Sequence, residues 1–202
     1  VPTFFLSRRM NDYQRIVDRA SYGIDVFFRK AFSRVDVAGP KFPADGRGRS
    51  RLVVASTHRS QTDYFLVGNI LHRMGVSNMR FAAGENLTTL PVIGRKFRAL
   101  GAFEVRRGRT FGREYVRALC ERVVSMLARG ETIVVFPEGG RSYAGNMMQI
   151  RGGIMGAGIL SQLRDPDGEV AVLPVTVSYE RLPELEDFGV LLPGKRMLRP
   201  GA

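Results

Sequence analysis

Apolar and polar positions along this 202-residue chain change their spacing from one segment to the next, which predicts helices and strands in turn. Residues 11–32 space their apolar side chains as one face of a helix does. The predicted apolar stripe consists of Ile16, Val17, Ile24, Phe27 and Phe28. Residues 39–51 are rich in Gly, Pro, Arg and Asp and are therefore predicted to form a loop.

Beyond this loop, short β-branched runs alternate with longer amphipathic runs. The predicted strands are RLVVAS, MRFAAG, AFEV, ETIVVF and EVAVLPVTVSY, at residues 51–56, 79–84, 102–105, 131–136 and 169–179. The predicted helices are residues 64–74, 91–101, 111–130 and 152–163. Pro174 removes a backbone donor from the last strand and predicts an edge or a bulge there. This alternation predicts an α/β fold, with a central, mainly parallel sheet flanked by helices.

The length argues for one compact unit, and 44% hydrophobic residues are enough for a buried core. We expect residues 1–50 to be a helical segment with a loop, and residues 51–202 to be the domain that carries the sheet. Because the chain begins with Val1 and ends in a loop-like stretch, we expect it to belong to a longer protein.

A net charge of +12 favours anionic partners such as phosphorylated substrates, acidic lipid headgroups or nucleic acid. The single cysteine, Cys120, excludes an internal disulfide and a cysteine cluster for zinc. No run of 18 apolar residues exists, so a membrane role would have to be at the surface.

The segment T-H-R-S-Q-T-D-Y places His58 and Asp63 where a strand gives way to a helix, the end of an α/β sheet at which ligands usually bind. Five positions along a regular helix would not put both side chains on one face, so they meet only if the loop folds back. If they meet, the carboxylate fixes the imidazole tautomer, and the other ring nitrogen can take a proton from a hydroxyl. The alternative is a histidine that caps the helix, with Asp63 in an exposed first turn.

Two further clusters follow strands. In G-A-F-E-V-R-R, Arg106 directly follows a strand predicted to be buried, and arginine pairs well with phosphate. In F-P-E-G-G-R-S, Gly139 and Gly140 let the backbone approach a ligand, with Glu138 as an acceptor for a hydroxyl. Arg141 and Ser142 in the same turn can donate to phosphate. The sequence contains no GxxxxGK[ST], GxGxxG or GxSxG motif, so nucleotide-binding loops and a serine hydrolase that uses Ser142 or Ser60 are disfavoured.

In their order and spacing, HRSQTD, GAFEVRR, FPEGGRS and VLPV resemble the four sequence blocks of the glycerolipid acyltransferase family. The resemblance covers residues 53–179 and leans toward bacterial membrane-associated glycerol-3-phosphate acyltransferases. It implies that residues 51–202 are the catalytic domain and that an acyl group moves from acyl-CoA or acyl-acyl-carrier protein to glycerol 3-phosphate, without a metal or other cofactor.

The resemblance also implies roles for the candidate residues. His58 would be the general base and Asp63 would orient it. Arg106, Arg141 and Ser142 would hold the phosphate, while Glu138 would order the turn or bind a hydroxyl.

Two alternatives stay open: the same chemistry on lysophosphatidate or another lipid alcohol, and a non-enzymatic basic module for anionic membranes. No nucleic-acid-binding signature is present, so nucleic acid is not expected as a partner. We expect peripheral attachment to the cytoplasmic side of a membrane, with Phe4, Phe5, Phe27 and Phe28 either on the lipid surface or packed against the domain.

Overall fold

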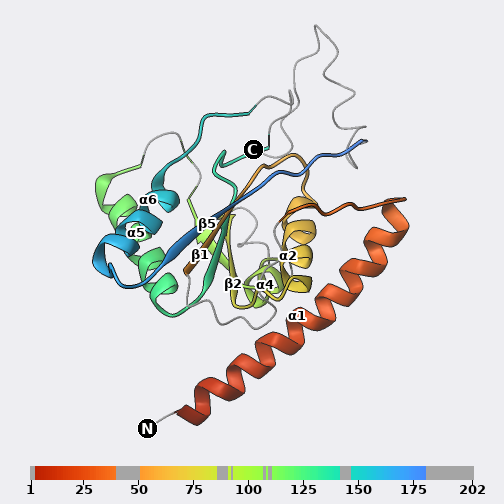
Figure 1. The fold of residues 1–202 in the computed structure, drawn as a ribbon, viewed down its shortest axis with the longest axis horizontal. Helices are drawn as coiled ribbons and strands as arrows, with labels where there is room; N and C mark the ends of the chain where they lie inside the picture. The colour runs from red at the N-terminus through yellow and green to blue at the C-terminus, as the bar shows by residue number, and fades with distance from the viewer. Residues whose placement is uncertain are drawn as a thin grey trace, which may run out of the picture.

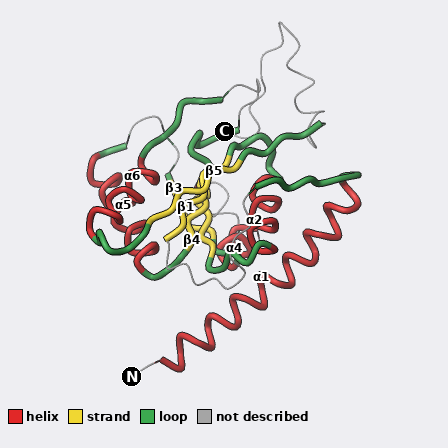
Figure 2. The backbone as a smooth tube through the Cα atoms, viewed as in Figure 1, coloured by secondary structure: helices red, strands yellow, loops and turns green. Residues whose placement is uncertain are grey.

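The computed structural model describes residues 3–39, 51–85, 91, 93–106, 108, 111–141 and 147–180. The chain folds into a five-stranded parallel sheet between two layers of helices, as predicted (Figures 1 and 2). The strands are β1 (Arg51–Ser56), β2 (Met79–Gly84), β3 (Ala102–Val105), β4 (Thr132–Val135) and β5 (Val170–Val175). Their order across the sheet is β3-β2-β4-β1-β5.

The helices are α1 (Thr3–Ala31), α2 (Asp63–Arg73), α4 (Ile93–Ala99), α5 (Arg113–Ala128) and α6 (Gly153–Arg164). Helices α5 and α6 cover one face of the sheet, while α1, α2 and α4 lie on the other side (Figure 1). Helix α5 ends where the sequence predicts, because Gly130 takes a positive φ of 74° after it.

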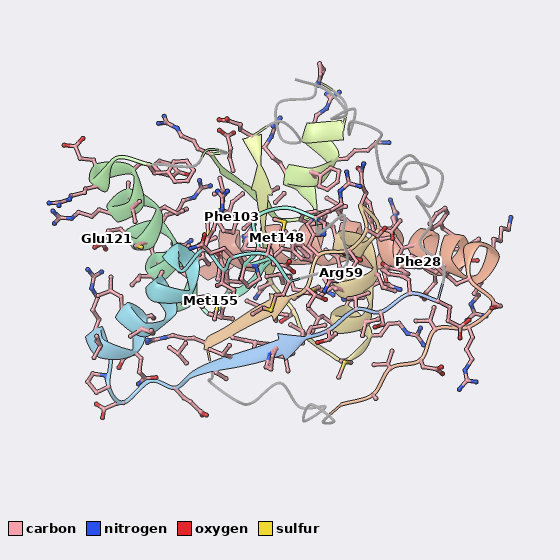
Figure 3. The ribbon with its side chains drawn as sticks, turned by 90° about the horizontal axis from the view of Figure 1, so that it is seen from above. Phe28, Arg59, Phe103, Glu121, Met148 and Met155 are labelled. Atoms are coloured by element: carbon pink, nitrogen blue, oxygen red, sulfur yellow. The ribbon has the colours of Figure 1, made fainter. Side chains whose placement is uncertain are left out.

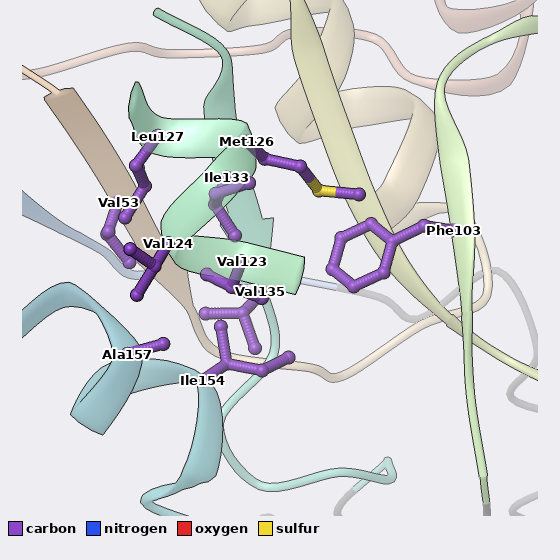
Figure 4. Packing of buried hydrophobic residues seen from close by; sticks show 10 residues of the cluster. All are labelled: Val53, Phe103, Val123, Val124, Met126, Leu127, Ile133, Val135, Ile154 and Ala157. Carbon is purple, nitrogen blue, oxygen red and sulfur yellow. The ribbon is translucent and has the colours of Figure 1, made fainter. Parts of the chain in front are cut away.

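Two apolar clusters join these layers. On the α5–α6 side, Val53, Val123, Leu127, Ile133 and Ala157 are completely buried in the larger cluster (Figure 4). On the opposite side, α2 packs against the sheet through a second cluster. Strand β4 is buried along its whole length because it lies at the centre of the sheet. Strand β5, which contains Pro174, lies at one edge, as the proline predicts.

Several polar side chains of helix α1 contact the domain. The Tyr13 hydroxyl donates to the Met79 carbonyl at 3.0 Å, and His72 Nε2 lies 3.1 Å from Asp18 Oδ1. Asn69 accepts a hydrogen bond from the Ser21 hydroxyl and donates one to Asp25 at 2.7 Å.

The predicted apolar stripe of α1 is only partly correct. Phe28 is buried, but Phe27 is 54% exposed and Ile16 is 45% exposed. These two side chains face solvent because a single helix can turn only a narrow face toward the domain. The side chains of Phe4 and Phe5 lie outside the described residues. Among the described residues, no helix is both long enough and apolar enough to cross a bilayer.

Candidate active site

His58 and Asp63 meet at the carboxyl end of β1, which is one of the two arrangements that the sequence left open. The chain turns back after β1, so that His58 Nδ1 lies 3.0 Å from Oδ2 of Asp63, the first residue of α2. Asp63 is completely buried and His58 is 7% exposed. The alternative with Asp63 in an exposed first turn is therefore wrong.

The Asp63 carboxylate is the centre of a hydrogen-bond network. Besides His58, it accepts hydrogen bonds from the N–H groups of Arg59 at 2.5 Å and Ser60 at 2.8 Å, and from the Tyr179 hydroxyl at 2.5 Å. Burial by itself would raise the pKa of Asp63, but the hydrogen bonds from His58, Tyr179 and the two amides hold this pKa below its ordinary value of 3.8. Asp63 is therefore ionised at neutral pH.

An ionised carboxylate can only accept hydrogen bonds, so Nδ1 of His58 must carry the proton in their contact. In the neutral imidazole this tautomer leaves a lone pair on Nε2, and no described residue forms a hydrogen bond to that nitrogen. The Phe136 ring stacks on the imidazole at 4.4 Å between centroids, and Tyr64 packs edge-on at 5.2 Å. The geometry provides a fixed imidazole that can take a proton from a hydroxyl.

Glu138 follows β4, the strand next to β1, and is 2% exposed. Its Oε1 accepts the N–H of His58 at 3.4 Å, and its Oε2 accepts the N–H of Met148 at 2.8 Å. In the view of Figure 3, Arg59 and Met148 lie between Met155 of α6 and Phe28 of α1. Both Glu138 oxygens bind backbone amides, which fits an ordering role better than the binding of a substrate hydroxyl.

The glycines after Glu138 shape the same turn. Gly139 adopts a φ of 66°, and a Cβ there would lie 2.9 Å from Cδ of Arg151. A Cβ on Gly140 would fit more easily, because it would lie at a van der Waals contact distance of 3.4 Å from Cε of Met148. Arg141 follows in a partly buried position. Ser142 lies outside the described residues.

Arg106 is not in contact with His58. Strand β3 is an edge strand in which only Phe103 is buried, so the expectation of a fully buried strand before Arg106 is wrong. The Arg106 guanidinium lies over the Tyr115 ring, 5.2 Å from its centroid. Three strand spacings separate β3 from β1, which is about 14 Å.

The side chain of Arg106 instead lines a polar hollow at the sheet edge. Arg98 and Arg122 line the same hollow, between β3 and α5. Glu104 also lines it, so three arginines against one carboxylate leave a net positive hollow that can accept an anionic group.

An apolar hollow lies beneath α1, bounded by α2, α4 and β2. Its lining includes Val17, Ile24, Phe65, Phe81 and Phe97. Tyr64 lines it as well, and the same ring packs against His58. His58 itself does not line the hollow, so Tyr64 is the residue that the hollow and the histidine site share.

Sequence patterns did not single out Tyr64, Phe136 or Tyr179 as site residues. The two rings next to His58 fall within segments assigned to a helix and a strand, where they resemble ordinary core residues. The sequence does place Tyr179 at the end of the last predicted strand, where it continues the alternation of apolar and polar positions.

Comparison with known proteins identifies the family of this chain. The family model described as Acyltransferase matches residues 34–178. The glycerol-3-phosphate acyltransferase of Xanthomonas axonopodis pv. citri (strain 306) is 38% identical over 133 residues, which are 66% of this chain and 15% of that protein. The enzyme of the same name from Pseudomonas paraeruginosa (strain DSM 24068 / PA7) is 34% identical over 158 residues, 78% of this chain and 19% of that protein. The chain thus spans less than a fifth of these relatives.

Among solved structures, the 1-acyl-sn-glycerophosphate (LPA) acyltransferase PlsC from Thermotoga maritima has the same fold, with a TM-score of 0.57. The sequences are 24% identical, and the match covers 82% of this chain and 59% of that one. Since the family model matches residues 34–178, which include all five strands, the chain belongs to the acyltransferase family.

Proposed function

We propose that this chain is the catalytic part of an enzyme that transfers a fatty acyl group from acyl-CoA or acyl-acyl-carrier protein to the hydroxyl of glycerol 3-phosphate. The observation that carries the proposal is the buried contact between His58 Nδ1 and ionised Asp63, which leaves Nε2 with a lone pair. The names of the Xanthomonas and Pseudomonas relatives support the choice of acceptor.

The reaction needs one base and no covalent acyl-enzyme. His58 Nε2 takes the proton of the acceptor hydroxyl while the oxygen attacks the thioester carbonyl carbon. The tetrahedral intermediate then expels the thiolate, which takes the proton back from the imidazolium. The carbon–oxygen bond replaces the carbon–sulfur bond, and Asp63 keeps its charge throughout.

Arginine side chains that follow strands at the carboxyl end of the sheet are suited to hold the acceptor's phosphate. We assign this role first to Arg141 and Ser142, the two residues that end the segment F-P-E-G-G-R-S. Gly139 and Gly140 would let the acceptor approach the backbone. Arg106 contributes positive charge from the far edge, and its basic hollow favours both the acceptor and the anionic donors.

A second acceptor is supported by the apolar hollow beneath α1. Because this hollow is apolar and shares Tyr64 with the His58 site, it is suited to the hydrocarbon chain of a donor or of an acyl-bearing acceptor such as lysophosphatidate. The chemistry at His58 is the same for both acceptors.

The outer face of α1 is suited to an anionic membrane surface. Ile16, Val26 and Phe27 are exposed there, and Arg19 and Lys30 are also exposed on this helix. Sedimentation with phosphatidylglycerol vesicles, but not with phosphatidylcholine vesicles, is expected. Equal sedimentation with both would contradict a role for the charge.

Product analysis tests the proposed function. Purified protein is incubated with palmitoyl-CoA and either glycerol 3-phosphate or lysophosphatidate, and the lipids are identified by mass spectrometry. Lysophosphatidate formed from glycerol 3-phosphate is the expected product. Phosphatidate formed only from lysophosphatidate would support the second acceptor instead. Vesicle binding without any product would support the non-enzymatic membrane module.

A further inference from the structure

We propose that Tyr179 is a positioning residue for the His58–Asp63 pair, acting through the hydrogen bond from its hydroxyl to Asp63. The inference rests on the proposed acyl transfer and extends it to a residue outside the four sequence blocks. Tyr179 and Asp63 are 116 positions apart in sequence, yet their oxygens lie 2.5 Å apart.

The backbone brings Tyr179 to this place by extending the β1–β5 pairing beyond the ends of both strands. The N–H of Thr57 donates to the Val175 carbonyl at 3.0 Å, and the N–H of Val177 donates to Oγ1 of Thr57 at 2.9 Å. Along this extended segment every second residue is partly buried, so Tyr179 points to the same side as Val175 and Val177. That side is the one on which α2 packs.

The two oxygens of Asp63 are used differently. Oδ2 receives the hydrogen bonds from His58, Arg59 and Ser60. Among the described residues, Oδ1 receives a hydrogen bond only from Tyr179. Removing this hydroxyl would leave a completely buried carboxylate oxygen without a hydrogen-bond donor from the described part of the chain.

The Tyr179 hydroxyl is itself held in place. Oγ1 of Thr62 lies 3.3 Å from it, and the Tyr179 ring packs against Phe32, just beyond α1, at 5.9 Å between centroids. Burial, followed by the contact with Asp63, raises the pKa of Tyr179 well above its ordinary value. The hydroxyl therefore stays protonated and can donate to Asp63 over the whole working pH range of an enzyme.

The main test is Tyr179→Phe, which removes only the hydroxyl. We expect kcat to fall by roughly 10- to 100-fold, the effect of losing a hydrogen bond to a charged group, while KM for both substrates stays nearly unchanged. Tyr22→Phe is the matched control, since Tyr22 is 75% exposed and should change neither quantity.

A double-mutant cycle separates positioning from general stability. If Tyr179 acts through Asp63, then Tyr179→Phe should cause little further loss of kcat in an Asp63→Asn background. Fully additive losses, or an unchanged kcat in the single variant, would overturn the proposal.

A measurement on the resting protein makes the inference testable without turnover. The ¹H resonance of the His58 Nδ1 proton should change in Tyr179→Phe and remain in place in Tyr22→Phe. If the wild type shows no acyl transfer but this resonance responds, the proposed function fails while the positioning contact stands. If the resonance is the same in wild type and Tyr179→Phe, the positioning role is wrong.

Discussion

His58 Nδ1 lies 3.0 Å from Asp63 Oδ2, although five positions along a regular helix would turn these side chains apart. The contact forms because residues 57–62 wrap around the carboxylate and direct two backbone N–H groups at it. The carboxylate therefore orders the loop that carries the proposed base, and its ionisation should be visible in the stability of the protein.

Asp63 should make stability depend on pH in the acid range. Its pKa in the folded protein is below the ordinary value of 3.8, so its contribution is fully present above that value and is lost as the pH falls through the folded pKa. Near neutral pH we expect Asp63→Asn to lower the free energy of unfolding by roughly 2–3 kcal/mol. Urea unfolding from about pH 7 to about pH 3 should show the difference between the two proteins shrinking. A difference that does not depend on pH would contradict the assigned ionisation.

Gly139→Ala should destabilise the turn after β4. The positive φ and the short distance to Arg151 both oppose a side chain, so we expect a loss of about 1–2 kcal/mol in the free energy of unfolding. Gly156→Ala is the matched control, because Gly156 lies within α6 and a Cβ there has no neighbour within 4 Å. Thermal unfolding should show an unchanged or higher Tm for the control. Equal losses in both variants would mean that the turn geometry is not responsible.

Filling the apolar hollow should change the preferred donor. Val17 lines the hollow from α1, and Val17→Phe would occupy space that we assign to an acyl chain. The ratio of kcat/KM for palmitoyl-CoA to that for octanoyl-CoA should fall by about 10-fold, as expected when the burial of one or two methylenes is lost. Exposed Ile159→Phe on α6 serves as a control of similar size. An unchanged ratio in Val17→Phe would mean that the acyl chain binds outside this hollow.

The two arginines should differ in their effect on the substrates. Arg141→Ala should raise KM for glycerol 3-phosphate by roughly 10-fold or more, since a charge-assisted contact to phosphate is lost. Arg106→Ala should have a smaller effect on the same KM, because β3 is about three strand spacings from β1. Initial rates with each substrate varied in turn measure both constants. A larger increase of KM for glycerol 3-phosphate in Arg106→Ala than in Arg141→Ala would assign the phosphate to Arg106 instead.

Most of the fold could be predicted from the sequence because each strand and helix has a clear local period. All five predicted strands form, and Pro174 correctly predicted an edge. The resemblance to glycerolipid acyltransferases is confirmed by the family match. The predicted contact between His58 and Asp63 also forms, because a buried carboxylate at a helix start can accept the loop amides.

The features that sequence patterns missed depend on tertiary distance. Ile16 and Phe27, which are exposed on α1, belong to the same predicted stripe as the buried Phe28, so periodicity alone could not separate them. The position of Arg106 follows from the strand order, which the sequence does not encode locally. The contact between Tyr179 and Asp63 joins residues far apart in the chain and depends on strand register.

Thiol release from palmitoyl-CoA, with and without glycerol 3-phosphate, tests the central claim most directly when wild type and His58→Ala are compared. The control variant is Arg164→Ala, since Arg164 pairs with Glu121 between α5 and α6, away from His58 and from both hollows. We predict release that requires the acceptor, that falls by at least about 100-fold in His58→Ala as expected for loss of a general base, and that persists in Arg164→Ala. Acceptor-dependent release at the wild-type rate in a folded His58→Ala variant would contradict the role of His58 as the base.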